Sequence, residues 1–184
     1  MKGPVFLGLL ALVAINAPAA AAEGDYAKSQ ITFVSKQMNV PVQGRFKKFT
    51  AQIDFDPKKL ASAKAQIEVD LASIDTGSPD ADAEVGKKAW FNSSVFPSAR
   101  FTSSSVGQAG PEKYQAHGKL SIKGIAQDVV APFTVKRSGT TLTYDGSFTL
   151  KRLQFKIGEG AWSDTETVAD DVQVIFHIVT TGNK

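Results

Sequence analysis

Apolar and polar residues alternate with a period of two through most of this 184-residue chain. The alternation is regular over residues 49–55, 63–71, 114–122, 129–135, 142–150 and 172–178. Successive side chains of a β-strand point to opposite faces, so each segment is expected to be a strand with one dry and one wet face. Residues 31–34 and 99–106 bring the number to about eight strands. Turn signals between them predict an all-β, antiparallel fold.

One segment departs from this period. Residues 78–80, Ser-Pro-Asp, are typical of a helix N-cap, a first helical proline and an acidic group in the first turn. Apolar residues then recur at positions 81, 85 and 89, which is the spacing of one helix face. We therefore predict one short helix over about 79–89, followed directly by a pair of large rings.

About eight antiparallel strands that share one apolar face can close as a sandwich or as a barrel. The interior of a barrel of that size is either filled by side chains or holds one slim ligand. Small residues stand beside phenylalanines at many inward positions: Ala51, Ala63, Ala65, Ala116, Gly118, Ala131 and Gly146. They either leave room for a ligand or interdigitate with large rings across the barrel. The pattern alone supports both interpretations equally.

The first 22 residues have the composition of a secretory signal peptide. Lys2 is the only charge before Glu23, residues 5–15 are almost entirely apolar, and a run of alanines that includes residues 20–22 precedes Glu23. The apolar stretch is too short to span a bilayer, which takes about 20 residues, so cleavage after Ala22 is favoured over an uncleaved anchor. We expect a signal peptide over 1–22 and one exported domain over 23–184. A bacterial periplasm is the expected location.

The composition excludes several kinds of chemistry. The chain has no cysteine, which removes disulfides, thiolate metal sites, thiol nucleophiles and a lipidated N-terminal cysteine. The 21 basic residues are nearly balanced by 18 acidic ones, so no nucleic-acid partner is expected. His117 and His177 do not have the spacing of metal ligands. We therefore expect no catalytic residue, no metal and no resident cofactor.

Large rings and basic groups remain as candidates for a site at one end of the barrel. Trp90, Phe91, Phe96 and Trp162 fall in irregular segments, where they either plug the end of the barrel or frame an entrance. Basic residues near 45–48 and 151–156 either meet a polar head group or form a solvated face. The solvated face is the favoured interpretation, because lysines normally lie in water.

Eight short motifs follow one another in a characteristic order. They are Ile-Thr-Phe-Val at 31–34, Gln-Gly-Arg-Phe-Lys-Lys-Phe at 43–49, Ile-Asp-Phe-Asp at 53–56, Ser-Ile-Asp-Thr-Gly at 73–77, Trp-Phe-Asn at 90–92, Phe-Pro-Ser-Ala-Arg-Phe at 96–101, Gly-Lys-Leu-Ser-Ile-Lys-Gly at 118–124 and Lys-Arg-Leu-Gln-Phe-Lys-Ile-Gly at 151–158. In this order the chain resembles the YceI-like polyisoprenoid-binding family of exported bacterial proteins, from about Tyr26 to its end. Many members carry Arg-x-Asp-Phe-Gly where this chain has Arg-Leu-Gln-Phe-Lys at 152–156.

The resemblance implies a lipocalin-like barrel whose apolar interior encloses a long isoprenoid chain, such as that of ubiquinone or polyprenyl phosphate. It also implies a b-type membrane cytochrome as a candidate partner, and we expect transient contact with a membrane. The residues expected to line the interior and the mouth are Phe33, Phe46, Phe49, Phe55, Ala65, Ile67, Trp90, Phe91, Phe101, Ala131, Phe133, Phe148, Phe155 and Trp162.

Three functions remain open at this point. The leading hypothesis is a lipid-binding protein for transport or storage that performs no catalysis. The second is an enzyme that acts on a similar lipid, whose general base would have to be a carboxylate or a lysine with a shifted pKa. The third is a structural or interaction module with a filled barrel, which the volume of the interior would distinguish from the first.

Overall fold

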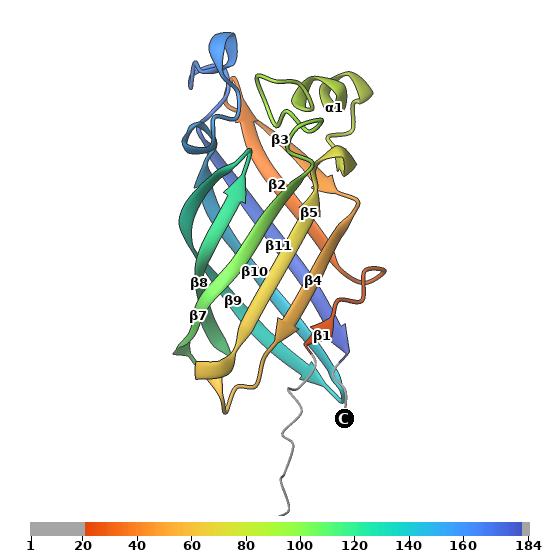
Figure 1. Ribbon diagram of the computed structural model, residues 1–184, viewed down its shortest axis with the longest axis vertical. Helices are drawn as coiled ribbons and strands as arrows, with labels where there is room; N and C mark the ends of the chain where they lie inside the picture. Colours follow the sequence, from red (N-terminus) through yellow and green to blue (C-terminus); the bar gives the residue numbers. More distant parts are fainter. Residues whose placement is uncertain (1–20, 182–184) are drawn as a thin grey trace, which may run out of the picture.

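The computed structural model describes residues 21–181, which form eleven strands in one continuous antiparallel sheet curled into a barrel (Figure 1). The strands are β1 (Ala22–Glu23), β2 (Gln30–Gln37), β3 (Val40–Phe46), β4 (Phe49–Asp54), β5 (Lys64–Asp70), β6 (Ile74–Asp75), β7 (Ser98–Gly110), β8 (Lys113–Ile122), β9 (Ile125–Ser138), β10 (Thr141–Lys151) and β11 (Asp171–Thr181). Their spatial order is β1-β4-β5-β7-β8-β9-β10-β11-β2-β3-β6. Most neighbours in the sheet are also consecutive in sequence, so hairpins build most of it.

All eight strands expected from the sequence are present, and the predicted lipocalin-like antiparallel barrel is confirmed. The predicted strand number was too low, because β1, β3 and β6 were missed. Strand β3 contains Pro41 and Gly44, residues that normally signal a turn or an edge. Strands β1 and β6 are two residues long, so no period of two can show in them.

The sheet is held closed by residues 22–25, which bridge β4 and β11. The Gly24 N–H donates to the Ala51 carbonyl of β4 at 3.0 Å, and Gly24 also pairs with Thr180 of β11. The next residue, Asp25, donates its N–H to the Val179 carbonyl at 2.6 Å. This bridge, which we call the seam, gives the sheet an inner face and occupies strand edges that would otherwise be free to pair with another chain.

The predicted helix is present, but it is shorter than expected. Helix α1 spans Pro79–Val85, with Ser78 as its N-cap and Gly86 as its C-cap. Residues 86–97 continue largely as turns rather than as helix. The end predicted near residue 89 is therefore wrong by about one turn, because the low helix propensity of glycine outweighs the apolar spacing that continues beyond it.

Helix α1 and the segment between β10 and β11 lie at the same end of the barrel, which we call the upper end (Figure 1). That segment includes two 3-10 turns, η3 (Arg152–Phe155) and η4 (Gly160–Trp162); the others are η1 (Leu60–Ser62) and η2 (Leu71–Ser73). Most of the predicted signal peptide lies outside the described residues, whereas Ala22 takes part in β1. Among residues 21–181, no helix is both long and apolar enough to cross a membrane.

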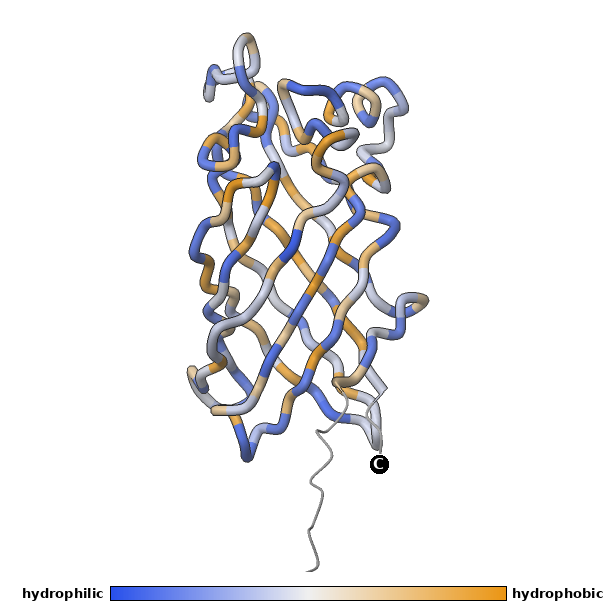
Figure 2. Tube along the Cα trace, viewed as in Figure 1, coloured by the Kyte–Doolittle hydropathy of each residue, from blue (hydrophilic) through white to orange (hydrophobic). Residues whose placement is uncertain are grey.

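Hydrophobic and hydrophilic positions alternate along the strands (Figure 2), and the small inward residues divide into two groups. Gly118 and Gly146 each lie beneath a phenylalanine ring: a Cβ would come within 2.8 Å of Phe101 and within 2.4 Å of Phe176, respectively. These glycines interdigitate with large rings. Four alanines instead border open space inside the barrel: Ala65, Ala99, Ala116 and Ala131. Each interpretation therefore holds for part of the set named from the sequence, whereas Ala51 and Ala63 are buried and border neither cavity.

Replacing Gly118 with alanine should lower the free energy of unfolding by about 1–3 kcal/mol, as for other overpacked cores. The new Cβ would lie 2.4 Å from the Thr102 carbonyl oxygen and 2.8 Å from the Phe101 ring. Gly107→Ala in β7 is the matched control, because its Cβ would meet nothing within 4 Å. Urea denaturation measures both variants. Equal stability of the two would show that the rings do not require a glycine at position 118.

Candidate functional site

A cavity of about 350 Å³ lies at the upper end of the barrel. Its wall is largely aliphatic and aromatic, with polar side chains at only a few positions: Ser35, Gln37, Thr76, Glu84 and Arg152. Trp90 and Trp162 both line it, with ring centroids 5.5 Å apart and planes inclined at 54°. They come from the two segments that cover the upper end, and we call the region around them the mouth. The volume is within the range of small-molecule sites, about 300–1,000 Å³.

The interior continues towards the lower end as a second cavity of about 120 Å³. Six residues border both spaces: Ile31, Val69, Ala99, Leu120, Phe148 and Val174. The two cavities are therefore adjacent parts of one apolar interior. A barrel filled by its own side chains, the third function considered from the sequence, does not fit this volume.

The structure brings together twelve of the fourteen residues expected at the site. Those that line the upper cavity are Phe33, Phe46, Trp90, Phe91 and Trp162, those that line the lower cavity are Phe55, Ala65, Ile67, Phe101, Ala131 and Phe133, and Phe148 borders both. The alternation placed most of them correctly, because inward strand positions of a barrel share one interior.

Phe49 and Phe155 do not line either cavity. The Phe49 ring packs edge-on against Tyr26, with centroids 5.7 Å apart, next to the segment that forms the seam. Phe155 is 1% exposed and packs in a buried cluster with Ile122 and Ile157. It belongs to η3 rather than to a strand, so the alternation of the preceding strand does not extend to it. The expectation that these two rings contact a ligand has no support in the geometry.

Arg152 is the feature of the site that the sequence placed wrongly. A solvated basic face was expected here, yet Arg152 is 1% exposed and lines the upper cavity. All five of its N–H groups donate to backbone carbonyls. Nε donates to Ala169 at 3.1 Å, Nη1 to Ile157 and Gly158 at 2.8 and 3.0 Å, and Nη2 to Trp162 and Val168 at 2.8 and 2.6 Å. One side chain thus holds the whole segment from 157 to 169 in place.

The charge of Arg152 is balanced mainly by these carbonyl dipoles. Burial lowers the pKa of the guanidinium, and the nearby Asp170 carboxylate opposes that effect. The guanidinium also lies 5.9 Å from the centroid of the Trp90 ring, a cation–π distance. The Trp90 Nε1 atom is buried and has no hydrogen-bond partner among the described residues. Two groups of opposite character therefore meet at the mouth. Arg152 carries a positive charge but has no N–H left to donate, and the neighbouring Trp90 has an N–H with no acceptor.

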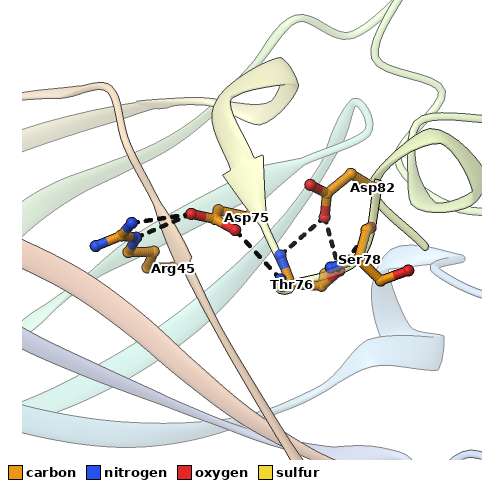
Figure 3. Close-up of polar contacts among 6 residues, drawn as sticks. Arg45, Asp75, Thr76, Ser78 and Asp82 are labelled. Atoms are coloured by element: carbon orange, nitrogen blue, oxygen red, sulfur yellow. Dashed lines mark hydrogen bonds and ion pairs between the residues drawn. The ribbon is translucent and has the colours of Figure 1, made fainter. Parts of the chain in front are cut away.

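Helix α1 is fastened to the opposite side of the mouth by two aspartates (Figure 3). Asp82 of α1 accepts hydrogen bonds from the Thr76 backbone N–H at 2.8 Å and from its hydroxyl at 2.7 Å. Asp75 of β6 accepts from Nε and Nη2 of Arg45 on β3 at 3.1 and 3.0 Å. Asp75 also accepts from the Gly77 N–H, and these contacts lower the pKa of its carboxyl group, the Arg45 hydrogen bond most strongly. These hydrogen bonds thus fix the position of helix α1 relative to the sheet.

The lower cavity ends at a cluster of four aromatic rings. Phe55 packs edge-on against Tyr114 and Tyr144, with centroids 5.0 and 5.7 Å away, and lies 6.1 Å from Phe133. Tyr144 is 3% exposed, and its burial raises the pKa of the phenol to about 12, partly opposed by the adjacent Thr180 hydroxyl. We call this group the ring cluster. It closes the interior at the end opposite the mouth.

Few ionisable side chains face the interior. The ionisable side chains that line the interior within residues 21–181 are Asp54, Lys64, Glu84, Tyr144 and Arg152, and neither histidine is among them. His177 instead contacts Asp145 through Nδ1 at 2.5 Å, away from the cavities. Within the same residues, no three His, Cys, Asp or Glu side chains gather as metal ligands would.

A closed antiparallel barrel with an apolar interior and a mouth framed by large rings defines a class: a lipocalin-like binding barrel. Comparison with known proteins identifies the family within that class. The chain matches the YceI-like domain over residues 23–180 and belongs to that family. The resemblance drawn from the eight motifs is thereby confirmed.

Three similar proteins illustrate the likeness in sequence and in structure. The crystal structure of BcnA from Burkholderia cenocepacia is 49% identical, with a TM-score of 0.84 over 86% of this chain and 99% of that one. A polyisoprenoid binding domain from Saccharophagus degradans has a TM-score of 0.73 at 19% identity, covering 89% and 99% of the two chains, which shows a shared fold. A UPF0312 protein of Photorhabdus laumondii is 34% identical over 87 residues, 47% of this chain and 45% of that protein.

Replacing Arg152 with lysine should lower the free energy of unfolding by about 3 kcal/mol or more, because several buried carbonyls lose their donors. The ammonium group is a single point donor and cannot reproduce the fork of five N–H groups. Arg137→Lys near the end of β9, where the side chain is exposed, is the control and should be almost neutral. Denaturant titration checks stability, and hydrogen exchange should show faster exchange across residues 157–169. A segment that stays protected would contradict the role assigned to Arg152.

Proposed function

We propose that this protein is an exported bacterial lipid-binding protein that encloses the chain of an isoprenoid lipid for transport or storage. The observation that supports it is the apolar interior that runs from the mouth to the ring cluster. An interior whose wall is largely apolar suits a ligand that needs few polar contacts along its length. A second support is the Saccharophagus degradans neighbour, which is described as a polyisoprenoid binding domain and has the same fold.

Apolar burial alone supplies enough free energy for such binding. Each CH₂ group moved from water into an apolar site contributes about 0.8 kcal/mol, so about twenty carbons contribute on the order of 16 kcal/mol. This gain offsets an association cost of roughly 4–15 kcal/mol. No covalent step or catalytic group is needed for holding and releasing the chain, which favours a binding protein over the enzyme considered from the sequence.

The mouth favours an uncharged head group, such as a quinone, over the phosphate of a polyprenyl phosphate. Arg152 supplies a positive field but has no N–H left to donate to a phosphate oxygen. The other ionisable group in the described wall of the upper cavity is Glu84, a carboxylate that has no proton to donate to a phosphate and is already paired with Lys87 at 2.5 Å. The unpartnered Trp90 Nε1 is a neutral donor, which suits a neutral carbonyl or hydroxyl oxygen.

Export to the periplasm follows from the sequence of residues 1–22 and stands as part of this proposal. In that compartment the protein would exchange its ligand with a membrane, through transient contact. A membrane cytochrome of the b type remains the candidate partner implied by the family.

Filling the lower cavity should abolish binding without unfolding the barrel. Ala131 of β9 lines that cavity, and Ala131→Phe should weaken the binding of a prenyl alcohol or quinone by at least tenfold, roughly 1.4 kcal/mol. Val130→Phe is the matched control, because the neighbouring Val130 is 45% exposed on the outer face. Organic extraction of each protein from its host, followed by mass spectrometry, measures retained lipid. Equal retention by both variants would place the ligand outside the barrel.

The head-group preference can be tested with two lipids of equal chain length. A ubiquinone should bind at least tenfold more tightly than the matching polyprenyl phosphate, a difference of about 1.4 kcal/mol. Glu84→Gln should strengthen binding of the phosphate and leave the quinone unchanged, because it removes a negative charge from the wall and releases Lys87 from its ion pair. Tryptophan fluorescence follows both titrations, since the sequence has two tryptophans and both line the mouth. Tighter binding of the phosphate to the unmodified protein would refute the preference.

A further inference from the structure

The wall of the barrel has a break between β9 and β10. From their lower ends, the two strands pair with each other only as far as Phe133 and Gly146. Above that point, residues 125–132 of β9 pair with β8, and residues 147–151 of β10 pair with β11. Within the described part of the chain, no backbone ladder joins β9 to β10 along these residues. The upper part of the wall is therefore closed here by side chains.

A proline accounts for the place where the pairing stops. Pro132 is the next residue of β9 above Phe133, and a Cβ on Gly146 would lie 2.4 Å from the Pro132 carbonyl oxygen. The backbone groups of Pro132 thus face β10, because the two groups of one residue point to the same neighbour in an antiparallel ladder. Proline has no N–H to donate, so the ladder cannot continue through this position.

A groove of about 380 Å³ occupies the break on the outside of the barrel. Val130 of β9 and Thr149 of β10 lie on its two sides, and both are exposed. Phe155 of η3 also lines it. The Gln127 side chain donates to the Gln154 carbonyl across the break at 3.4 Å, which is long for a hydrogen bond. The two sides of the groove are thus joined weakly.

One layer of side chains separates this groove from the interior. Phe148 of β10 borders the groove and both interior cavities, and Leu150 borders the groove and the upper cavity. Phe155 is 1% exposed, and both of these side chains pack against its buried cluster. The contacts that close the break are apolar. Rotating the Phe148 ring would therefore connect the groove with the interior without breaking a backbone hydrogen bond.

The mouth, in contrast, is covered by segments that are tied down by charged groups. Five hydrogen bonds from Arg152 hold residues 157–169. Asp82 fastens helix α1 to Thr76 with two more. Hydrogen bonds to charged groups are the stronger kind, so displacing either segment costs more than turning a ring. The break between β9 and β10 is the easier way into the interior.

From the proposed isoprenoid-binding function, on which this inference rests, we infer that the break between β9 and β10 is a lateral entrance with Phe148 as its gate. A long apolar chain can pass sideways through such an opening and does not have to thread end-on through the covered mouth. Both cavities lie directly behind Phe148 and receive the chain. The entrance sets the rate of exchange, whereas the apolar interior sets the affinity.

A crosslink across the groove tests the entrance. The sequence has no cysteine, so a pair of introduced thiols can be joined selectively. Val130→Cys combined with Thr149→Cys places one thiol on each side of the groove, and a short, cleavable bis-maleimide joins them. Stopped-flow tryptophan fluorescence follows the binding of geranylgeraniol. The joined form should bind and release it at least about tenfold more slowly at an unchanged Kd, because only the barrier between the two states is raised.

The matched control is a crosslink lower down between the same strands. Lys136 and Thr143 lie opposite each other where β9 and β10 are already paired. Joining Lys136→Cys to Thr143→Cys should leave both rates unchanged. Cleaving the linker between positions 130 and 149 should restore the rates of the protein that was not joined.

A variant of the gate tests the same inference without a crosslink. Phe148→Leu shortens the side chain that closes the break and should raise the association rate by at least about threefold. Phe49→Leu is the control, because Phe49 borders neither the groove nor the cavities, and its rates should not change.

The outcomes separate this inference from the proposed function. Equal rates with and without the crosslink between positions 130 and 149 would overturn the lateral entrance and place the route at the mouth, with isoprenoid binding intact. Equal slowing by the control crosslink would also overturn it, since general stiffening would then explain the effect. If the unmodified protein binds no geranylgeraniol, the proposed function fails and this inference fails with it.

Discussion

Closure of the sheet is the constraint on which the other features depend. A twisted sheet with one apolar face must cover that face with another layer or curl until the face covers itself. This chain takes the second course, and the hydrogen bonds of Gly24 and Asp25 to β4 and β11 complete it. Once the seam is made, the inner face becomes an interior. Its volume then depends on which inward side chains are large, small or absent.

The fold was largely predictable because the burial of a barrel strand depends on a local pattern. A period of two requires no knowledge of partners, and a strand of six or more residues shows it clearly. Strand β3 shows it too, at Val42, Gly44 and Phe46, but Pro41 and Gly44 disguised the pattern as a turn. Helix α1 was found from its N-cap and overextended at its end, where Gly86 stops it.

The candidate site was predictable to the extent that it consists of inward strand positions. Phe155 and Arg152 were misplaced because both follow β10 in η3, where no period relates sequence to direction. The burial of Arg152 depends on the carbonyls of five other residues, up to position 169. The local sequence does not predict these contacts. One signal was available: the chain has Lys156 where the family pattern has glycine, and Lys156 adopts a left-handed conformation with φ of 55°. A turn that requires this conformation indicates a backbone that reverses direction, here around the Arg152 side chain.

The seam also has a consequence for the order in which the protein folds. It joins Gly24 to Thr180, residues near opposite ends of the described chain, so it is a contact of very high sequence separation. The hairpins of the sheet are local and can form as they are synthesised, but this contact requires β11 to be present. Until then the apolar inner face remains exposed, and the chain is most open to aggregation or to capture by a chaperone. The interior therefore comes into existence in a single late step, when the first and last strands meet.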